Sequence, residues 1–158
     1  MTTALQKWFI LYSENHQNPV NKKIHYTCVP LIFLSVLGIM SSIEIPVKLG
    51  EALHTSLGLH YFFLAGALIF YLRHSPCIFY GVSIFALICI MLIEAVRMQN
   101  EIAPQTIFVS VFVLAWIGQF IGHKIEKKKP SFFTDLVFLL IGPAWIVKNI
   151  FCKLEFEF

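Results

Sequence analysis

The sequence predicts an all-α integral membrane protein: a bundle of four to five transmembrane helices with an N-terminal interfacial helix. Hydrophobic residues make up 58% of the chain and charged residues only 13%, whereas soluble domains balance the two more evenly. The apolar residues also gather in runs long enough to cross a bilayer, which takes about 20 helical residues. With 158 residues, we expect a single membrane domain (1–158) without a separate soluble domain.

The N-terminal segment, about residues 3–17, predicts a helix that lies in the membrane interface. It mixes polar and aromatic residues without a continuous apolar run, which argues against a signal peptide. Trp8, Tyr12 and His16 recur at helical spacing and would share one face. Because Trp and Tyr favour the boundary between lipid and water, this face is expected to lie there.

A second helix is expected to begin at a tight corner and to lead into the first span. Asn18 is a favourable N-cap, and Pro19 is a favourable first helical residue. The apolar runs that predict crossings cover about residues 28–45, 57–72, 77–96 and 106–122. A further segment, about residues 132–151, has a shorter apolar stretch interrupted by Gly142 and Pro143. It therefore suits a short, broken or re-entrant segment as well as a span.

Basic residues predict that the N-terminus lies in the cytoplasm. With five crossings, eight lysines and arginines fall on the N-terminal side and four on the other; with a re-entrant last segment the numbers are ten and two. The eight are Lys7, Lys22, Lys23, Arg73, Lys124, Lys127, Lys128 and Lys129. Positive residues favour the cytoplasmic side, so we expect the N-terminus to lie there.

Two polar clusters lie where apolar segments meet water, and both fall on this predicted cytoplasmic side. In the first, Asn21 and His25 are four residues apart and share a helix face, just after His16. In the second, Gln119 and His123 share a stripe that continues to the residue three positions later, Glu126. Gly118 and Gly122 form a G-x-x-x-G pair in the second segment, which allows a neighbouring helix to approach closely.

Three of the histidines are candidate metal ligands. Neutral imidazole binds iron, zinc or copper, and a carboxylate beside it can bind the metal or orient a ring. His16, His25 and His123, completed by Glu126 or water, would form a non-haem Fe(II) site, and zinc suits the same ligands. A single histidine at a membrane edge is more often an ordinary polar residue, and we keep that interpretation for the other three, His54, His60 and His74.

Both clusters resemble motifs of the membrane 2-hydroxy fatty acid dioxygenase family. His16 to His25 reads H-x-N-P-x-N-x-x-x-H, and Trp116 to His123 reads WIGQFIGH, followed by Glu126 and a basic run. Further positions similar to the family are Val29-Pro30, the segment Pro130 to Leu136, and Gly142-Pro143. In the family's eukaryotic motif the glutamate follows the histidine by four residues, whereas here the spacing is three, as in the shorter bacterial form.

The resemblance implies Fe(II)-dependent α-oxidation, in which dioxygen and a 2-hydroxy fatty acid give a fatty acid one carbon shorter. It implies iron ligands at His16, His25 and His123. It also implies a bacterial inner membrane protein, or an endoplasmic reticulum protein in a eukaryote. Residues expected to orient ligands or substrate are Asn18, Asn21, Gln119 and Glu126, with Lys128 as a candidate for attracting the substrate carboxylate. The lysine run also fits a simple cytoplasmic anchor, and Glu126 fits either a ligand or an orienting residue.

Two other functions stay open from the residues alone. Histidines on different helices could be axial ligands of a haem, although a porphyrin needs space between facing spans. A non-enzymatic helical membrane protein, such as a scaffold or small transporter, could use both clusters only for packing. The expected partners are the 2-hydroxy fatty acid, dioxygen and the lipid bilayer. The basic run is too short to indicate nucleic acid, and the sequence predicts no particular oligomeric state.

Overall fold

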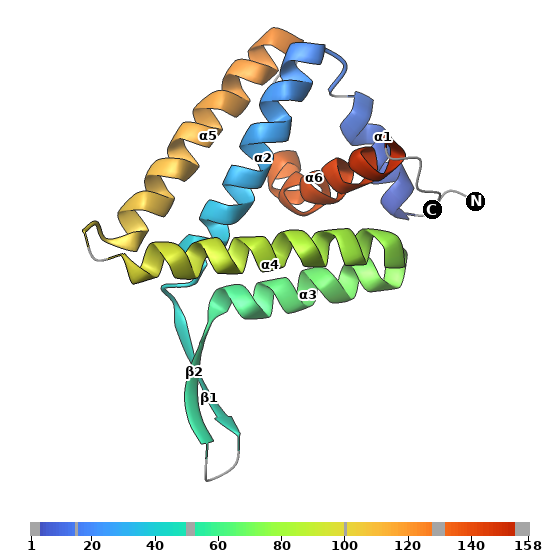
Figure 1. Ribbon diagram of the computed structural model, residues 1–158. Helices are drawn as coiled ribbons and strands as arrows, with labels where there is room; N and C mark the ends of the chain where they lie inside the picture. Colours follow the sequence, from blue (N-terminus) through green and yellow to red (C-terminus); the bar gives the residue numbers. More distant parts are fainter. Residues whose placement is uncertain (1–3, 15, 50–52, 100, 128–131, 154–158) are drawn as a thin grey trace.

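The computed structural model describes residues 4–14, 16–49, 53–99, 101–127 and 132–153, and these residues form six helices and one β-hairpin (Figure 1). In chain order the elements are α1 (Ala4–Glu14), α2 (Pro19–Met40), β1 (Glu44–Leu49), β2 (Leu53–Gly58), α3 (Leu59–His74), α4 (Pro76–Met98), α5 (Pro104–Glu126) and α6 (Phe132–Lys153). The predicted all-α class is confirmed, since the antiparallel hairpin is the only sheet among the described residues.

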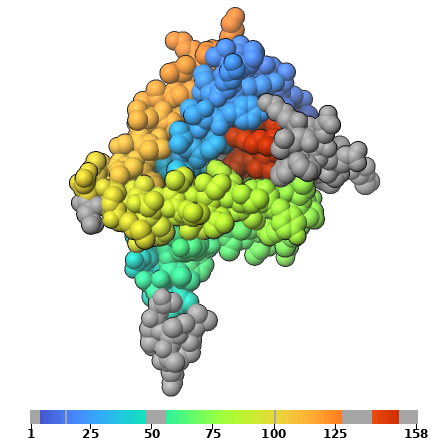
Figure 2. Space-filling model, viewed as in Figure 1, coloured from blue at the N-terminus to red at the C-terminus, as the bar shows by residue number. Residues whose placement is uncertain are grey.

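The helices pack as pairs that cross one another. α2 lies along α5, and α3 runs back along α4 as an antiparallel pair beneath them (Figure 1). α6 lies in the space bounded by α1, α2 and α4, and it reaches the surface between α2 and α4 (Figure 2). The corner between α1 and α2 and the C-terminal end of α5 meet at one end of the molecule (Figure 1).

The corner before α2 forms as the sequence predicts. Asn18 is the N-cap, and its side-chain oxygen accepts hydrogen bonds from the backbone N–H groups of Val20 and Asn21 at 2.9 and 3.4 Å. Pro19 follows as the first helical residue, where its missing N–H costs no helical hydrogen bond. These local contacts fix the direction in which α2 leaves the corner.

Glycines let α2 and α5 approach at three levels. A Cβ atom on Gly118 would lie 2.6 Å from the sulfur of Cys28, and one on Gly122 would overlap the side-chain oxygen of Asn21. On α2, a Cβ atom on Gly38 would overlap a phenylalanine ring of α5. The close approach expected from the G-x-x-x-G pair is therefore confirmed, and it brings the site end of α5 against α2.

Three helices have the length and composition needed to cross a membrane within the described part of the chain: α2, α4 and α5. α3 is shorter, with 16 residues. Large apolar side chains on α4 and α5 point outward, as expected of surfaces that face lipid. The helices that carry the two polar clusters, α2 and α5, thus both qualify as membrane spans.

The hairpin is the main departure from the expected elements. The predicted span 28–45 ends early because α2 stops at Met40 and a turn leads into β1, and the predicted span 57–72 begins with two residues of β2. Apolar residues alternate with polar or proline residues from Ile43 to Val47, a period of two that suits a strand, and Pro46 cannot supply a helical N–H.

Both ends of the chain also differ from the simplest expectation. α1 ends at Glu14, so His16 belongs to the corner and not to the interfacial helix predicted over 3–17. Tyr12 is buried inside the protein, whereas it was expected at the membrane interface, because it packs against Trp145 of α6. α6 itself is one continuous helix with Pro143 inside it, not a broken segment.

Replacing Gly38 by alanine is expected to destabilise the protein by about 1–3 kcal/mol, because the added methyl group has no space against the buried ring of Phe108. Gly66→Ala on α3 is the matched control, since nothing lies within 4 Å of a Cβ atom there. The control should be neutral or stabilising by up to about 1 kcal/mol, as alanine favours helix. Thermal unfolding of both variants in detergent gives the comparison; equal midpoints would contradict the close packing of α2 and α5.

Candidate functional site

Three histidines from three segments come together at the end of the α2–α5 pair. His16 lies in the corner after α1, His25 on α2 and His123 on α5. Their ring centroids are 4.1 Å (His16 to His25), 5.2 Å (His25 to His123) and 6.0 Å (His16 to His123) apart. The three residues are 1%, 2% and 7% exposed, respectively. The two clusters found in the sequence are therefore one buried group of imidazoles.

Two of these rings are oriented by the backbone. Nδ1 of His16 lies 2.6 Å from the carbonyl oxygen of Tyr12, and Nδ1 of His25 lies 3.0 Å from that of Asn21. A carbonyl only accepts, so in each pair Nδ1 must carry the hydrogen and donate it. The neutral ring then has its lone pair on Nε2, which is the form that binds a metal.

An aromatic wall from α1 and α6 holds His16 in place. The ring of Tyr12 stacks on His16 with centroids 4.1 Å apart and planes at 14°. Trp145 lies 5.0 Å from Tyr12 and 6.1 Å from His16, and its Nε1 donates a 2.8 Å hydrogen bond to Ser13 Oγ. Trp145 is not among the residues that the sequence predicts for the site. Its position in an apolar segment could have indicated a polar contact, because the indole N–H of a buried tryptophan usually needs a hydrogen-bond partner.

Glu126 joins the end of α5 to the corner before α2. Its Oε1 accepts a 2.8 Å hydrogen bond from the N–H of Gln17, and its Oε2 accepts from the N–H of Asn18 at 3.0 Å and from Nδ2 of Asn21 at 2.8 Å. The carboxylate also lies at the start of α2, where the helix dipole favours a negative charge. Since both oxygens are used by the corner, Glu126 in this structure positions the segment that carries His16.

The amide side chains predicted for the site are also buried there. Asn21 is completely buried and Gln119 nearly so. Oδ1 of Asn21 and Oε1 of Gln119 accept no hydrogen bond from the described residues. A buried acceptor without a donor costs about 1–3 kcal/mol, so these oxygens are suited to a bound ligand or water. Asn18 is the helix cap described above, and Lys128 lies outside the described residues.

The donor set suits a metal such as iron or zinc, although it is not assembled around one point. Rings that bind one ion through nitrogens at about 2.1 Å have centroids roughly 4.5 to 6 Å apart, close to the distances observed here. Within the described residues, no three His, Cys, Asp or Glu side chains already form a group that could hold an ion. The chemistry of the histidines therefore fits a metal, and binding would require the rings to turn toward a common position.

The remaining histidines do not join this group. The ring of His60 is buried at the start of α3 beside Tyr61, and His74 is exposed at the end of α3, where its Nδ1 lies 2.7 Å from the carbonyl oxygen of Phe70. The side chain of His54 lies outside the described residues. The exposed position of His74 agrees with its interpretation as an ordinary polar residue at the membrane edge. His60 does not fit that interpretation, because it is 1% exposed and neither of its ring nitrogens has a hydrogen-bond partner among the described residues.

A comparison with protein families identifies the chain over almost its whole length. Residues 2–154 match the family model described as "Mpo1-like: 2-hydroxy-palmitic acid dioxygenase Mpo1-like". Neither a curated protein nor a solved structure matches the chain. The match includes every residue of the histidine group and agrees with the resemblance seen in the sequence motifs. The protein belongs to the Mpo1-like family, whose name describes a dioxygenase of a 2-hydroxy fatty acid.

Proposed function

We propose that the protein is an Fe(II)-dependent dioxygenase that converts a 2-hydroxy fatty acid to the fatty acid one carbon shorter. The observation that supports this most strongly is the buried group of three imidazoles, in which His123 of α5 meets His16 and His25 from the corner and α2. The family description supports the substrate class. The reaction balances without a separate reductant: hydroxy acid plus dioxygen gives the shorter acid, carbon dioxide and water.

The histidines and the amide side chains have different roles in the proposed site. His16, His25 and His123 would hold the iron, with the first two presenting Nε2 because their Nδ1 atoms face carbonyl oxygens. Bound Fe(II) would supply a centre that binds the hydroxyl and carboxylate oxygens of the substrate and activates dioxygen. The buried oxygens of Asn21 and Gln119 can accept a hydrogen bond from the substrate hydroxyl. Burial of the rings limits the access of water to the reacting atoms.

The ring contacts argue against the haem alternative. His16 and His25 lie edge to face with centroids 4.1 Å apart, and His123 is within 6.0 Å of both. Axial ligands must lie on opposite faces of a porphyrin, and rings in direct contact leave little space for one. A non-enzymatic protein would need neither the buried imidazoles nor the two unsatisfied amide oxygens beside them.

The wild-type protein reconstituted with Fe(II) without oxygen should form pentadecanoic acid from 2-hydroxyhexadecanoic acid once dioxygen is added. Replacing His25 or His123 by alanine should lower the rate by about 100-fold or more, because each substitution removes a ligand. Product analysis by mass spectrometry and metal analysis of the same samples give both measurements.

His74→Ala is the matched control, because that exposed side chain is outside the histidine group. It should keep both the activity and the iron content. No shortened acid from the wild type would overturn the activity, and a His25→Ala or His123→Ala variant with full turnover would overturn the site.

Glu126→Gln should weaken Fe(II) binding by about 10- to 100-fold without removing it, because the variant loses the charge and one acceptor that hold the corner. Turnover should return toward the wild-type value at saturating iron. Iron titration and kcat at saturating iron separate this positioning role from direct ligation. A variant that binds no iron at saturation would show instead that Glu126 is a ligand.

A further inference from the structure

A pocket with a mixed lining lies between α1, the turn from α3 to α4, and α6. Its volume is about 240 Å³, and none of the residues that line it belongs to the group of three histidines described above. Its walls combine the apolar side chains of Leu5, Phe9 and Ile78 with the polar side chains of Gln6 and Lys148. An apolar wall beside a cation suits a ligand that has an apolar part and a negative charge.

The positive charge of the pocket comes from Lys148 on α6. Its ammonium nitrogen lies 5.0 Å from the centroid of the Phe9 ring, so the aromatic face holds the cation over the apolar wall. No aspartate or glutamate lines the pocket, and within the described residues no carboxylate lies within ion-pair distance of Lys148. The pocket therefore has a cation that no described side chain neutralises.

The start of α4 favours an anion in the same place. Ser75, the N-cap of α4, and Ile78 both line the pocket, and Ser75 Oγ accepts a 3.4 Å hydrogen bond from the N–H of Ile78. Pro76 has no N–H, which leaves the N–H of Cys77 without an intrahelical acceptor. The first turn of this 23-residue helix contains no acidic residue, so the positive end of its dipole is not compensated there.

The pocket lies at the level where lipid headgroups are expected. α4 has the length and composition to cross a membrane, and the pocket is at its first turn, where a spanning helix meets the headgroups. His74, at the end of α3, lines the pocket with an exposed ring whose Nδ1 lies 2.7 Å from the carbonyl oxygen of Phe70. Basic pockets between membrane helices bind the headgroups of acidic lipids.

We propose that this pocket binds the phosphate group of an anionic phospholipid. Lys148 and the start of α4 face the phosphate, and the apolar wall of Leu5, Phe9 and Ile78 contacts the first carbons of the acyl chains. The bound lipid connects α1 to the α3–α4 turn and to α6. The site lies outside the proposed reaction, so it can be tested without iron or a 2-hydroxy acid.

Short-chain lipids test this assignment on the purified protein in a non-ionic detergent. Dioctanoyl-phosphatidylglycerol should bind about fivefold more tightly than dioctanoyl-phosphatidylcholine, because one lysine near an anionic lipid contributes about that factor. Lys148→Met should remove this preference, since methionine keeps an unbranched side chain but has no charge, and Lys148→Arg should keep it. Isothermal titration calorimetry gives the dissociation constants.

Lys7→Met is the matched control, because Lys7 is an exposed lysine of α1 that does not line the pocket. It should keep the wild-type preference. Equal affinity of the wild type for the two lipids would overturn the proposal, as would the same loss of preference in Lys7→Met and Lys148→Met. Inorganic phosphate at the concentration of the lipid should not compete. Full competition by inorganic phosphate would show a site for the free anion and overturn the lipid assignment.

Discussion

The contact between α2 and α5 fixes the position of both polar clusters. Gly122 lies against the side chain of Asn21, and the neighbouring His123 is thereby brought to 5.2 Å from the ring of His25. A larger residue at Gly122 would have to displace a fully buried asparagine and the ring next to it. Close packing of small residues is a main source of helix association where the surroundings are already apolar. In this protein the same packing also brings the candidate ligands together.

A second connection forms at the corner before α2. Glu126 accepts hydrogen bonds from the N–H groups of Gln17 and Asn18, which precede α2, and from the side chain of Asn21 within it. These partners are more than 100 residues away in the sequence. The carboxylate satisfies N–H groups that the start of a helix leaves without intrahelical partners. It thus holds the corner that carries His16, which lies in no helix, against α2 and α5.

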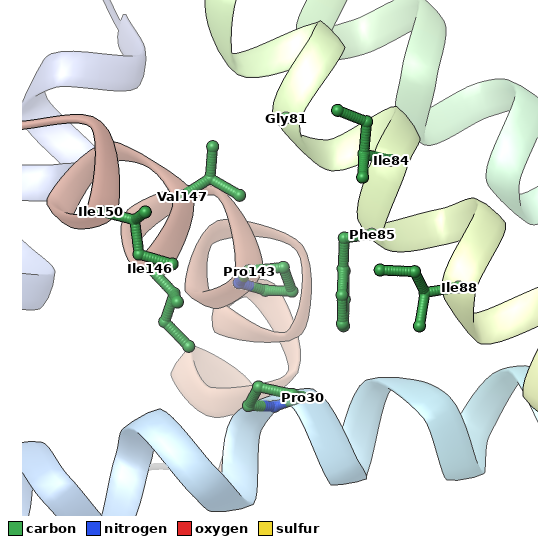
Figure 3. Close-up of a pocket in the computed structure, with 9 residues that line it drawn as sticks. All are labelled: Pro30, Gly81, Ile84, Phe85, Ile88, Pro143, Ile146, Val147 and Ile150. Atoms are coloured by element: carbon green, nitrogen blue, oxygen red, sulfur yellow. The ribbon is translucent and has the colours of Figure 1, made fainter. Parts of the chain in front are cut away.

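α6 makes contacts on two of its faces. Trp145 packs with Tyr12 and Tyr26 beside the histidines, at centroid distances of 5.0 and 5.5 Å. Pro143 and Ile146 instead line an apolar groove between α2, α4 and α6 (Figure 3). Tyr71 of α3 donates a hydrogen bond to the carbonyl oxygen of Leu140, which ties α6 to the α3–α4 pair. α6 therefore packs beside the histidines on one face and lines an apolar groove on another.

The sequence by itself determined the fold class, most of the helices and the local geometry of each cluster. The cap at Asn18, the shared face of Asn21 and His25, and the glycine pair on α5 all depend on residues within a few turns of one another, so spacing predicts them. The alternation from Ile43 to Val47 also suits a strand, but it overlaps the end of an apolar run that suits a membrane span. Only the tertiary structure decided that the clusters meet, that Glu126 binds the opposite corner and that Trp145 completes the wall. Such contacts depend on how helices cross, which no periodicity within one segment specifies.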